Sequence, residues 1–138
     1  MAARMNVGDP PREVRVDSPE KWNDSGIIVA RGEEYEIDVP PDQIWIDRTI
    51  ENTPDGSSSR GVVQKLTVGL RRKPDAPWFA LIAAIGQSDE ADSMTVIGAG
   101  KKPFHPQMDG QLYFFANDVR VAYGNNKGAI TLTITRTR

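Results

Sequence analysis

The sequence contains no cysteine, so disulfide bonds and thiolate metal ligands are excluded. Its formal net charge is only -2, from 17 basic and 19 acidic residues, which gives no basic surface for nucleic acid. No apolar run reaches the length of a membrane span, and the first residues lack the apolar core of a secretory signal. We therefore predict no nucleic-acid partner and no membrane span. The location stays open between the cytoplasm and release without a cleavable signal peptide.

Catalytic groups are also scarce. His105 is the single histidine, and it lies in a proline-bounded loop without a cysteine to activate. The paired carboxylates Glu33-Glu34 and Asp89-Glu90 fall where a solvated strand face or turn is expected. No glycine-rich phosphate-binding motif is present. We predict that the protein is not an enzyme, and a hydrolase that depends on His105 is the least favoured alternative.

The chain length of 138 residues fits one domain that is large enough to bury a core. Residues 1–11 show no periodicity and end in Pro10-Pro11, which predicts a flexible N-terminal tail. Residues 12–138 are predicted to form a single domain.

Alternating apolar and polar residues, the pattern of half-buried strands, recur along this domain. The predicted strands are residues 13–17, 26–30, 33–39, 62–68, 94–97, 111–116 and 129–135, with 43–47 as a further candidate. Residues 76–86 form the most apolar run, and Pro77 near its start and Gly86 at its end favour a central strand covered on both faces. Eight or nine strands without an amphipathic helix predict an all-β fold, an antiparallel jelly-roll β-sandwich.

Three loop features leave alternatives open. Residues 50–61 form a long polar loop that either borders a site or is a simple insertion. The basic run at residues 71–74 is predicted to be a solvated turn. Trp22, Trp45 and Trp78 could stack on sugar rings, although tryptophans in a small sandwich more often belong to the core.

Residues 117–128 form the most informative stretch, because they concentrate oxygen ligands between two predicted strands. The stretch contains one carboxylate, Asp118, with the amides of Asn117, Asn125 and Asn126 and two glycines. Carboxylate, amide and carbonyl oxygens are the ligands that Ca²⁺ prefers, and glycine lets a loop fold tightly around an ion. Asn, Asp and Gly are also ordinary turn residues, so the composition alone leaves open a plain loop.

The order of residues in this stretch resembles the calcium and sugar loop of the PA-I galactophilic lectin family. The matching positions are Asn117-Asp118-Val119, Tyr123-Gly124-Asn125-Asn126 and Gly128, followed by an alternating strand. Weaker matches upstream are Ser25–Val29, Gly32–Val39, Ala80–Ile82, Ile85-Gly86 and Gly110–Leu112. The similarity spans roughly Trp22 to Ile134, and it implies a bacterial lectin with a β-sandwich fold and Ca²⁺ as its cofactor.

The resemblance also implies a set of site residues. Asp118, Asn125 and Asn126 would bind the metal through side-chain oxygens, and Ala122 and Arg48 would bind it through backbone carbonyls. Asp118, Val119 and Asn125 would contact a galactose-like sugar, two hydroxyls of which complete the coordination of the ion. With one carboxylate the site would stay net positive, which limits its calcium affinity. Because family lectins are multivalent, the resemblance also implies a possible homo-oligomer.

Some positions depart from the family pattern. Ala122 stands where the family usually has a hydroxyl, and Arg48 stands where it has a tyrosine. The loop at 50–61 has neither the histidine nor the glutamine that grip the sugar in the family. The sequence therefore predicts a calcium-dependent carbohydrate-binding protein, and the alternative is a non-catalytic accessory or protein-interaction sandwich that has lost sugar binding.

Overall fold

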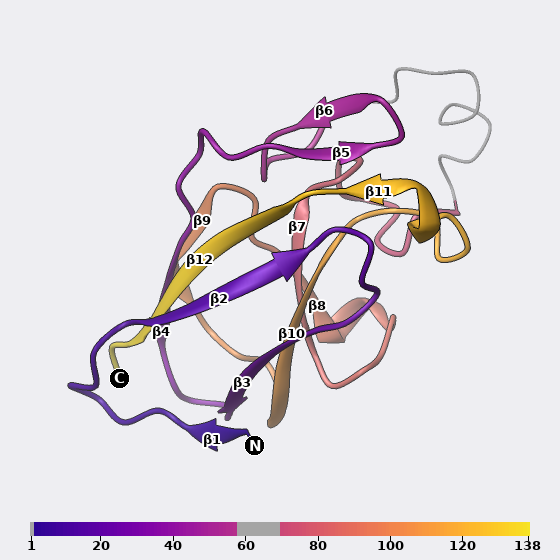
Figure 1. The fold of residues 1–138 in the computed structure, drawn as a ribbon. Coiled ribbons are helices and arrows are strands. Elements are labelled where there is room, and N and C mark those ends of the chain that lie inside the picture. The colour runs from indigo at the N-terminus through magenta and orange to yellow at the C-terminus, as the bar shows by residue number, and fades with distance from the viewer. Residues whose placement is uncertain (1, 58–69) are drawn as a thin grey trace.

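The computed structural model describes residues 2–57 and 70–138, and it confirms the all-β sandwich (Figure 1). One sheet has five strands, in the order β1 (Ala3–Arg4), β3 (Asn23–Val29), β10 (Gly110–Ala116), β7 (Leu81–Ile85) and β8 (Met94–Val96). The other has four strands, in the order β2 (Arg12–Asp17), β12 (Ala129–Arg136), β4 (Tyr35–Asp38) and β9 (Gly100–Phe104). The strand pairs are antiparallel except β1 with β3, which is parallel.

The core lies between these two sheets and is built by the predicted alternation. On β12, Ile130, Leu132 and Ile134 are buried, whereas the intervening threonines are only partly covered. They pack in one cluster with Leu112 and Phe114 of β10, from the facing sheet. Burial of every second residue on facing strands is the pattern of two sheets packed face to face.

Strand β7 is covered on both faces, as predicted. Leu81, Ala83 and Ile85 join the main core, while Ile82 and Ala84 join a second cluster with Met94 and Phe115 on the outer face of the sheet. The strand begins only at Leu81 because Phe79 has a φ of 59°, which no strand residue adopts. The predicted strand at 76–86 is therefore shorter at its N-terminal end.

A small third sheet closes one end of the sandwich. Its order is β11 (Asn126–Lys127), β5 (Trp45–Asp47) and β6 (Ile50–Asn52), and all its pairings are antiparallel. Figure 1 shows this sheet at the end of the molecule opposite both chain termini. The loop between β10 and β11 reaches the same end, and it contains the 3₁₀ turn η3 (Tyr123–Asn125); another 3₁₀ turn, η2 (Ala91–Ser93), precedes β8.

The structure corrects several predictions made from the sequence. Ala3–Arg4, which were assigned to a flexible tail, pair with β3, and Met5 is buried in the core. Strand β9 was not expected, because Lys101-Lys102-Pro103 lacks alternation and the strand is specified by its pairing with β4. The start of the expected loop at 50–61 forms β6, while 58–61 and the predicted strand at 62–68 lie outside the described residues. No helix in the described part of the chain is long and apolar enough to cross a membrane.

Candidate metal centre

The loop after β10 is fixed at its base by Asn117, whose side chain is completely buried. Its amide oxygen accepts a hydrogen bond from the Lys73 backbone N–H at 3.0 Å, and its Nδ2 donates to the Lys73 carbonyl at 2.9 Å and the Pro77 carbonyl at 3.0 Å. These contacts replace the sheet hydrogen bonds that end at Ala116. Asn117 therefore anchors the loop, and its own amide is fully used in bonds to the backbone.

Arg72 supports the loop from beneath. Its backbone N–H donates to the Asp118 carbonyl at 3.1 Å, and its Nη1 donates to the Tyr123 hydroxyl at 2.9 Å. The guanidinium lies 3.4 Å from the Phe115 ring centroid and 4.3 Å from that of Trp22, and it pairs with Asp89 at 3.0 Å. The predicted solvated basic turn is therefore wrong for Arg72, because aromatic rings and a carboxylate compensate its burial.

The third sheet brings the end of the loop, at Asn125 and Asn126, next to Asp47 and Arg48. Asn126 on β11 lies opposite Asp47 on β5, and the Arg48 N–H donates to the Asn125 carbonyl at 3.1 Å. Arg48 has a φ of 58°, an uncommon conformation for a residue with a side chain. Gly128, with a φ of 86°, then turns the chain into β12.

Three oxygen atoms in this region are buried without a hydrogen-bond partner among the described residues. They are Asp118 Oδ2, Asn125 Oδ1 and Asn126 Oδ1. The other polar atoms of these residues are engaged, since Asp118 Oδ1 accepts from the Val119 N–H at 2.7 Å and Asn126 Nδ2 donates to the Ser18 carbonyl at 3.1 Å. An unpartnered buried acceptor costs roughly 1–3 kcal/mol, so three together indicate a missing donor or cation.

The electrostatics of Asp118 agree with a cation site. Burial raises the pKa of Asp118, and the neighbouring carboxylate of Asp47 raises it further, to about 6. Both carboxylates are buried, with 2% and 5% of their residue surface exposed. Two like charges out of water repel each other strongly, and a divalent cation would remove that repulsion.

Asp47 is the residue that the sequence interpretation missed. It occupies the last position of β5, two residues after the buried Trp45 and therefore on the same face of the strand. A charged residue that shares the buried face of a strand is the signal that could have found it. The prediction of a site with a single carboxylate did not consider this second carboxylate nearby.

The structure brings together most of the predicted ligands. Asp118, Asn125 and Asn126 lie in the loop and its exit strand, and the backbone bond from Arg48 to Asn125 places Arg48 beside them. Ala122 immediately precedes η3, with its N–H bonded to the Val119 carbonyl at 2.9 Å. Val119 forms a bridge to Arg71 and is partly exposed beside Asp118.

The oxygens present fit Ca²⁺ by type, since carboxylate, amide and carbonyl groups are its usual ligands. No cluster of three or more histidine, aspartate or glutamate side chains able to hold a metal occurs in residues 2–57 and 70–138. The candidate site offers instead the unpartnered oxygens of one carboxylate and two amides, with the Asp47 carboxylate nearby. A softer metal would need histidine or thiolate ligands, which this region does not offer.

The remaining candidate residues, the tryptophans and His105, contact other side chains of the fold. Trp45 and Trp78 are buried, and Trp22 packs edge-on against Phe115 with the Arg72 guanidinium over its ring. His105 is about half exposed and lies 3.7 Å from Glu34. All three tryptophans thus take part in packing.

Comparisons with known proteins find similarity among solved structures. No protein-family model matches the chain, and no curated protein matches it. Among solved structures, the fold is similar to the "EclA N-terminal domain; PllA-like lectin", with a TM-score of 0.64 and 18% sequence identity. The alignment covers 90% of this chain and 94% of that one, so this chain has the fold of a lectin domain over nearly its whole length.

Proposed function

We propose that this protein is a lectin that binds a galactose-like sugar through a calcium ion held by the loop at residues 117–126. The observation that carries the proposal is the set of unpartnered buried oxygens of Asp118, Asn125 and Asn126. The fold shared with a lectin domain supports it, and so does the order of the loop residues.

The residues have distinct tasks in this proposal. Asp118, Asn125 and Asn126 hold the ion through side-chain oxygens, and the carbonyls of Ala122 and Arg48 complete the protein's share. When bound, Ca²⁺ supplies open coordination positions that two adjacent sugar hydroxyls can occupy, since it takes roughly six to eight oxygens. Asp118, Val119 and Asn125 contact the sugar and orient it on the site. The interaction needs no catalytic group.

Thermal unfolding tests the proposal in three conditions: with calcium, with chelator, and with calcium plus galactose. A ligand at about 100 times its dissociation constant stabilises the native state by roughly 2.7 kcal/mol, a shift of several degrees in the midpoint. We expect calcium to raise the midpoint and galactose to raise it further. Asp118→Ala should abolish both shifts, and a variant that still shows them would contradict the site.

The alternative is an accessory or protein-interaction sandwich that has lost sugar binding. It is favoured by Ala122, which offers no hydroxyl, and by the stretch at 50–61, which contains neither histidine nor glutamine. A glycan array run with calcium and with chelator separates the two. A calcium-dependent hit supports the lectin, whereas a midpoint that responds to calcium without any glycan hit supports the interaction module with a structural ion.

A further inference from the structure

Arg48 is an exposed arginine beside the candidate metal centre, and its guanidinium has no partner among the described residues. With Thr49 it forms the two-residue turn that joins β5 to β6. Its N–H donates to the Asn125 carbonyl at 3.1 Å. This bond fixes the start of a long, flexible side chain next to Asn125 and Asn126, whose side-chain oxygens are buried and unpartnered in the described part of the chain.

The turn itself gives no reason for an arginine at this position. Arg48 has a φ of 58°, and hairpin turns place glycine, asparagine or aspartate where φ is positive, because other side chains clash with the backbone there. Strained residues of this kind cluster at functional sites. Residues 58–69, which follow the third sheet and lie outside the described part, contain no aspartate or glutamate that could pair with Arg48. The arginine is therefore available to a ligand.

The other exposed charges of the third sheet lie on its far face. Glu51 of β6 and Lys127 of β11 are both opposite Ile46 of β5, so these two side chains of opposite charge share one face of the sheet. Asn126 precedes Lys127 on β11 and therefore points to the other face. Arg48 is thus the cation of this sheet that can serve a ligand bound beside Asn126.

The chemistry of a free guanidinium indicates what kind of ligand it would bind. Its planar fork of N–H groups matches a carboxylate or a sulfate, each of which accepts two parallel hydrogen bonds. Neutral sugar hydroxyls do not use this geometry. A calcium ion in the proposed site would add further positive charge to the same region. Both features favour a sugar that carries negative charge outside the hydroxyls that bind the ion.

We propose that the site selects galactose-like sugars with a carboxylate or a sulfate at C6, and that the Arg48 guanidinium binds this anionic group. The inference rests on the proposed function and names its ligand class. An anion at the exocyclic carbon leaves the ring hydroxyls free for calcium. Because Arg48 is exposed, the ion pair is screened by solvent, so the preference over the neutral sugar should be about three- to tenfold and should decrease at high salt.

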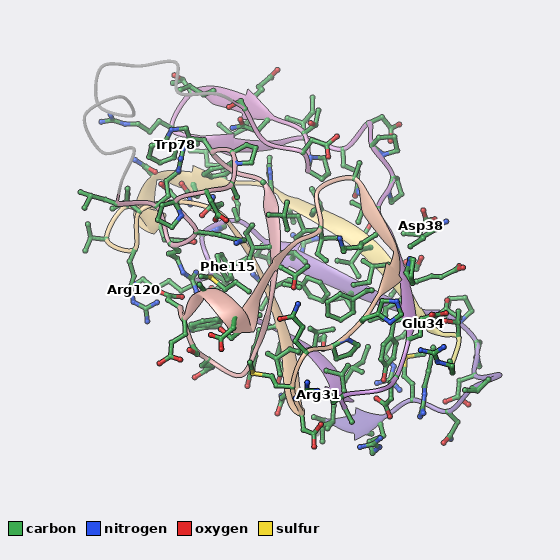
Figure 2. The ribbon with its side chains drawn as sticks, turned by 180° about the vertical axis from the view of Figure 1, so that it is seen from behind. Arg31, Glu34, Asp38, Trp78, Phe115 and Arg120 are labelled. Atoms are coloured by element: carbon green, nitrogen blue, oxygen red, sulfur yellow. The ribbon has the colours of Figure 1, made fainter. Side chains whose placement is uncertain are left out.

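Isothermal titration in calcium tests the inference with methyl galactoside, its C6 carboxylate and its C6 sulfate. The quantity compared is the ratio of the neutral to the anionic dissociation constant within each protein, which cancels any effect of a substitution on the ion itself. Arg48→Gln should lower this ratio to about one. Arg31→Gln is the matched control, because it removes the same charge from an exposed side chain and should keep the parent ratio. Figure 2 shows Arg31 at the end of the molecule opposite Trp78 and the third sheet.

Arg48→Lys keeps the charge without the planar fork and should retain only part of the preference. Equal ratios in the parent and in Arg48→Gln would overturn the inference, while calcium-dependent binding of the neutral sugar would leave the lectin function standing. Binding of the anionic sugars that persists in chelator would also overturn it, because calcium would then take no part. If no sugar, neutral or anionic, binds in calcium, the proposed function fails first and the inference with it.

Discussion

Two buried carboxylates at opposite ends of the sandwich are treated in different ways by the same fold. Glu33, just before β4, is 5% exposed, and Asp118, in the loop after β10, is 2% exposed. Comparable burial would predict comparable compensation, because a buried charge needs partners. The protein supplies two arginines for Glu33, whereas one oxygen of Asp118 has no hydrogen-bond partner among the described residues.

Glu33 is compensated entirely by the chain itself. Arg136 lies 3.2 Å from its Oε2, Arg4 binds the same oxygen, and Oε1 accepts hydrogen bonds at 2.8 Å from the Tyr35 hydroxyl and the Ala30 N–H. This network joins the N-terminal strand, β4 and the C-terminal strand. It explains why residues 3–5 lie against the sandwich instead of forming a flexible tail.

Asp118 shows the opposite arrangement. One of its oxygens bonds to the Val119 N–H, while the other is unpartnered among the described residues, and the charge of Asp47 raises its pKa. The same chain compensates the buried charge of Glu33 with two arginines. The difference supports the proposal that the loop end of the molecule binds a cation.

The largest expected effect comes from removing the buried charge of Glu33. Glu33→Gln leaves Arg4 and Arg136 facing a neutral amide, and we expect it to lower the free energy of unfolding by about 2–3 kcal/mol, less than for a fully buried pair because Arg4 is half exposed. Urea denaturation with calcium and with chelator measures it. The loss should be the same in both conditions, and a loss confined to one of them would link Glu33 to the metal and remove the contrast.

The contrast also explains which parts of the structure were readable from the sequence. Strands with their own alternation, such as β2 and β12, were predicted within a residue or two, because period 2 is local information. The edge strand β9 was not, since its Lys-Lys-Pro run carries no pattern and depends on β4. The same holds for Arg72, whose burial requires Trp22 and Phe115 from distant segments.

The candidate site also combines residues that a local stretch reveals with one that only long-range pairing brings in. Asp118, Asn125 and Asn126 were predicted as ligands because they occupy one continuous stretch that resembles the calcium loop of the PA-I galactophilic lectin family. Asp47 comes from another strand, and only the pairing of β5 with β11 brings it there. The buried oxygens that support a cation site also needed the structure, since burial without a partner is a property of three-dimensional packing.

A smaller effect is expected at Arg72, which pairs with Asp89 and whose backbone N–H donates to the Asp118 carbonyl. Arg72→Lys keeps the charge but loses the planar guanidinium that bonds Tyr123 and Asp89 and stacks on Phe115. We expect a loss of about 1–2 kcal/mol in the free energy of unfolding, together with weaker calcium binding, because the backbone of residue 72 also holds the Asp118 carbonyl. Titration calorimetry and urea denaturation on the same samples check both. A variant that loses stability but binds calcium unchanged would separate the support of the loop from its metal site.

The smallest effect is expected at Val121, the residue at the tip of the loop. Its surface is 91% exposed, so Val121→Thr exchanges a methyl group for a hydroxyl in contact with water, and the free energy of unfolding should change by less than about 0.5 kcal/mol. The calcium shift of the unfolding midpoint should also be unchanged, because the unpartnered oxygens lie inside the loop and not at its tip. If Val121→Thr weakens calcium binding as much as Asp118→Ala does, the ion sits at the exposed tip. The buried carboxylates of Asp47 and Asp118 would then need another explanation.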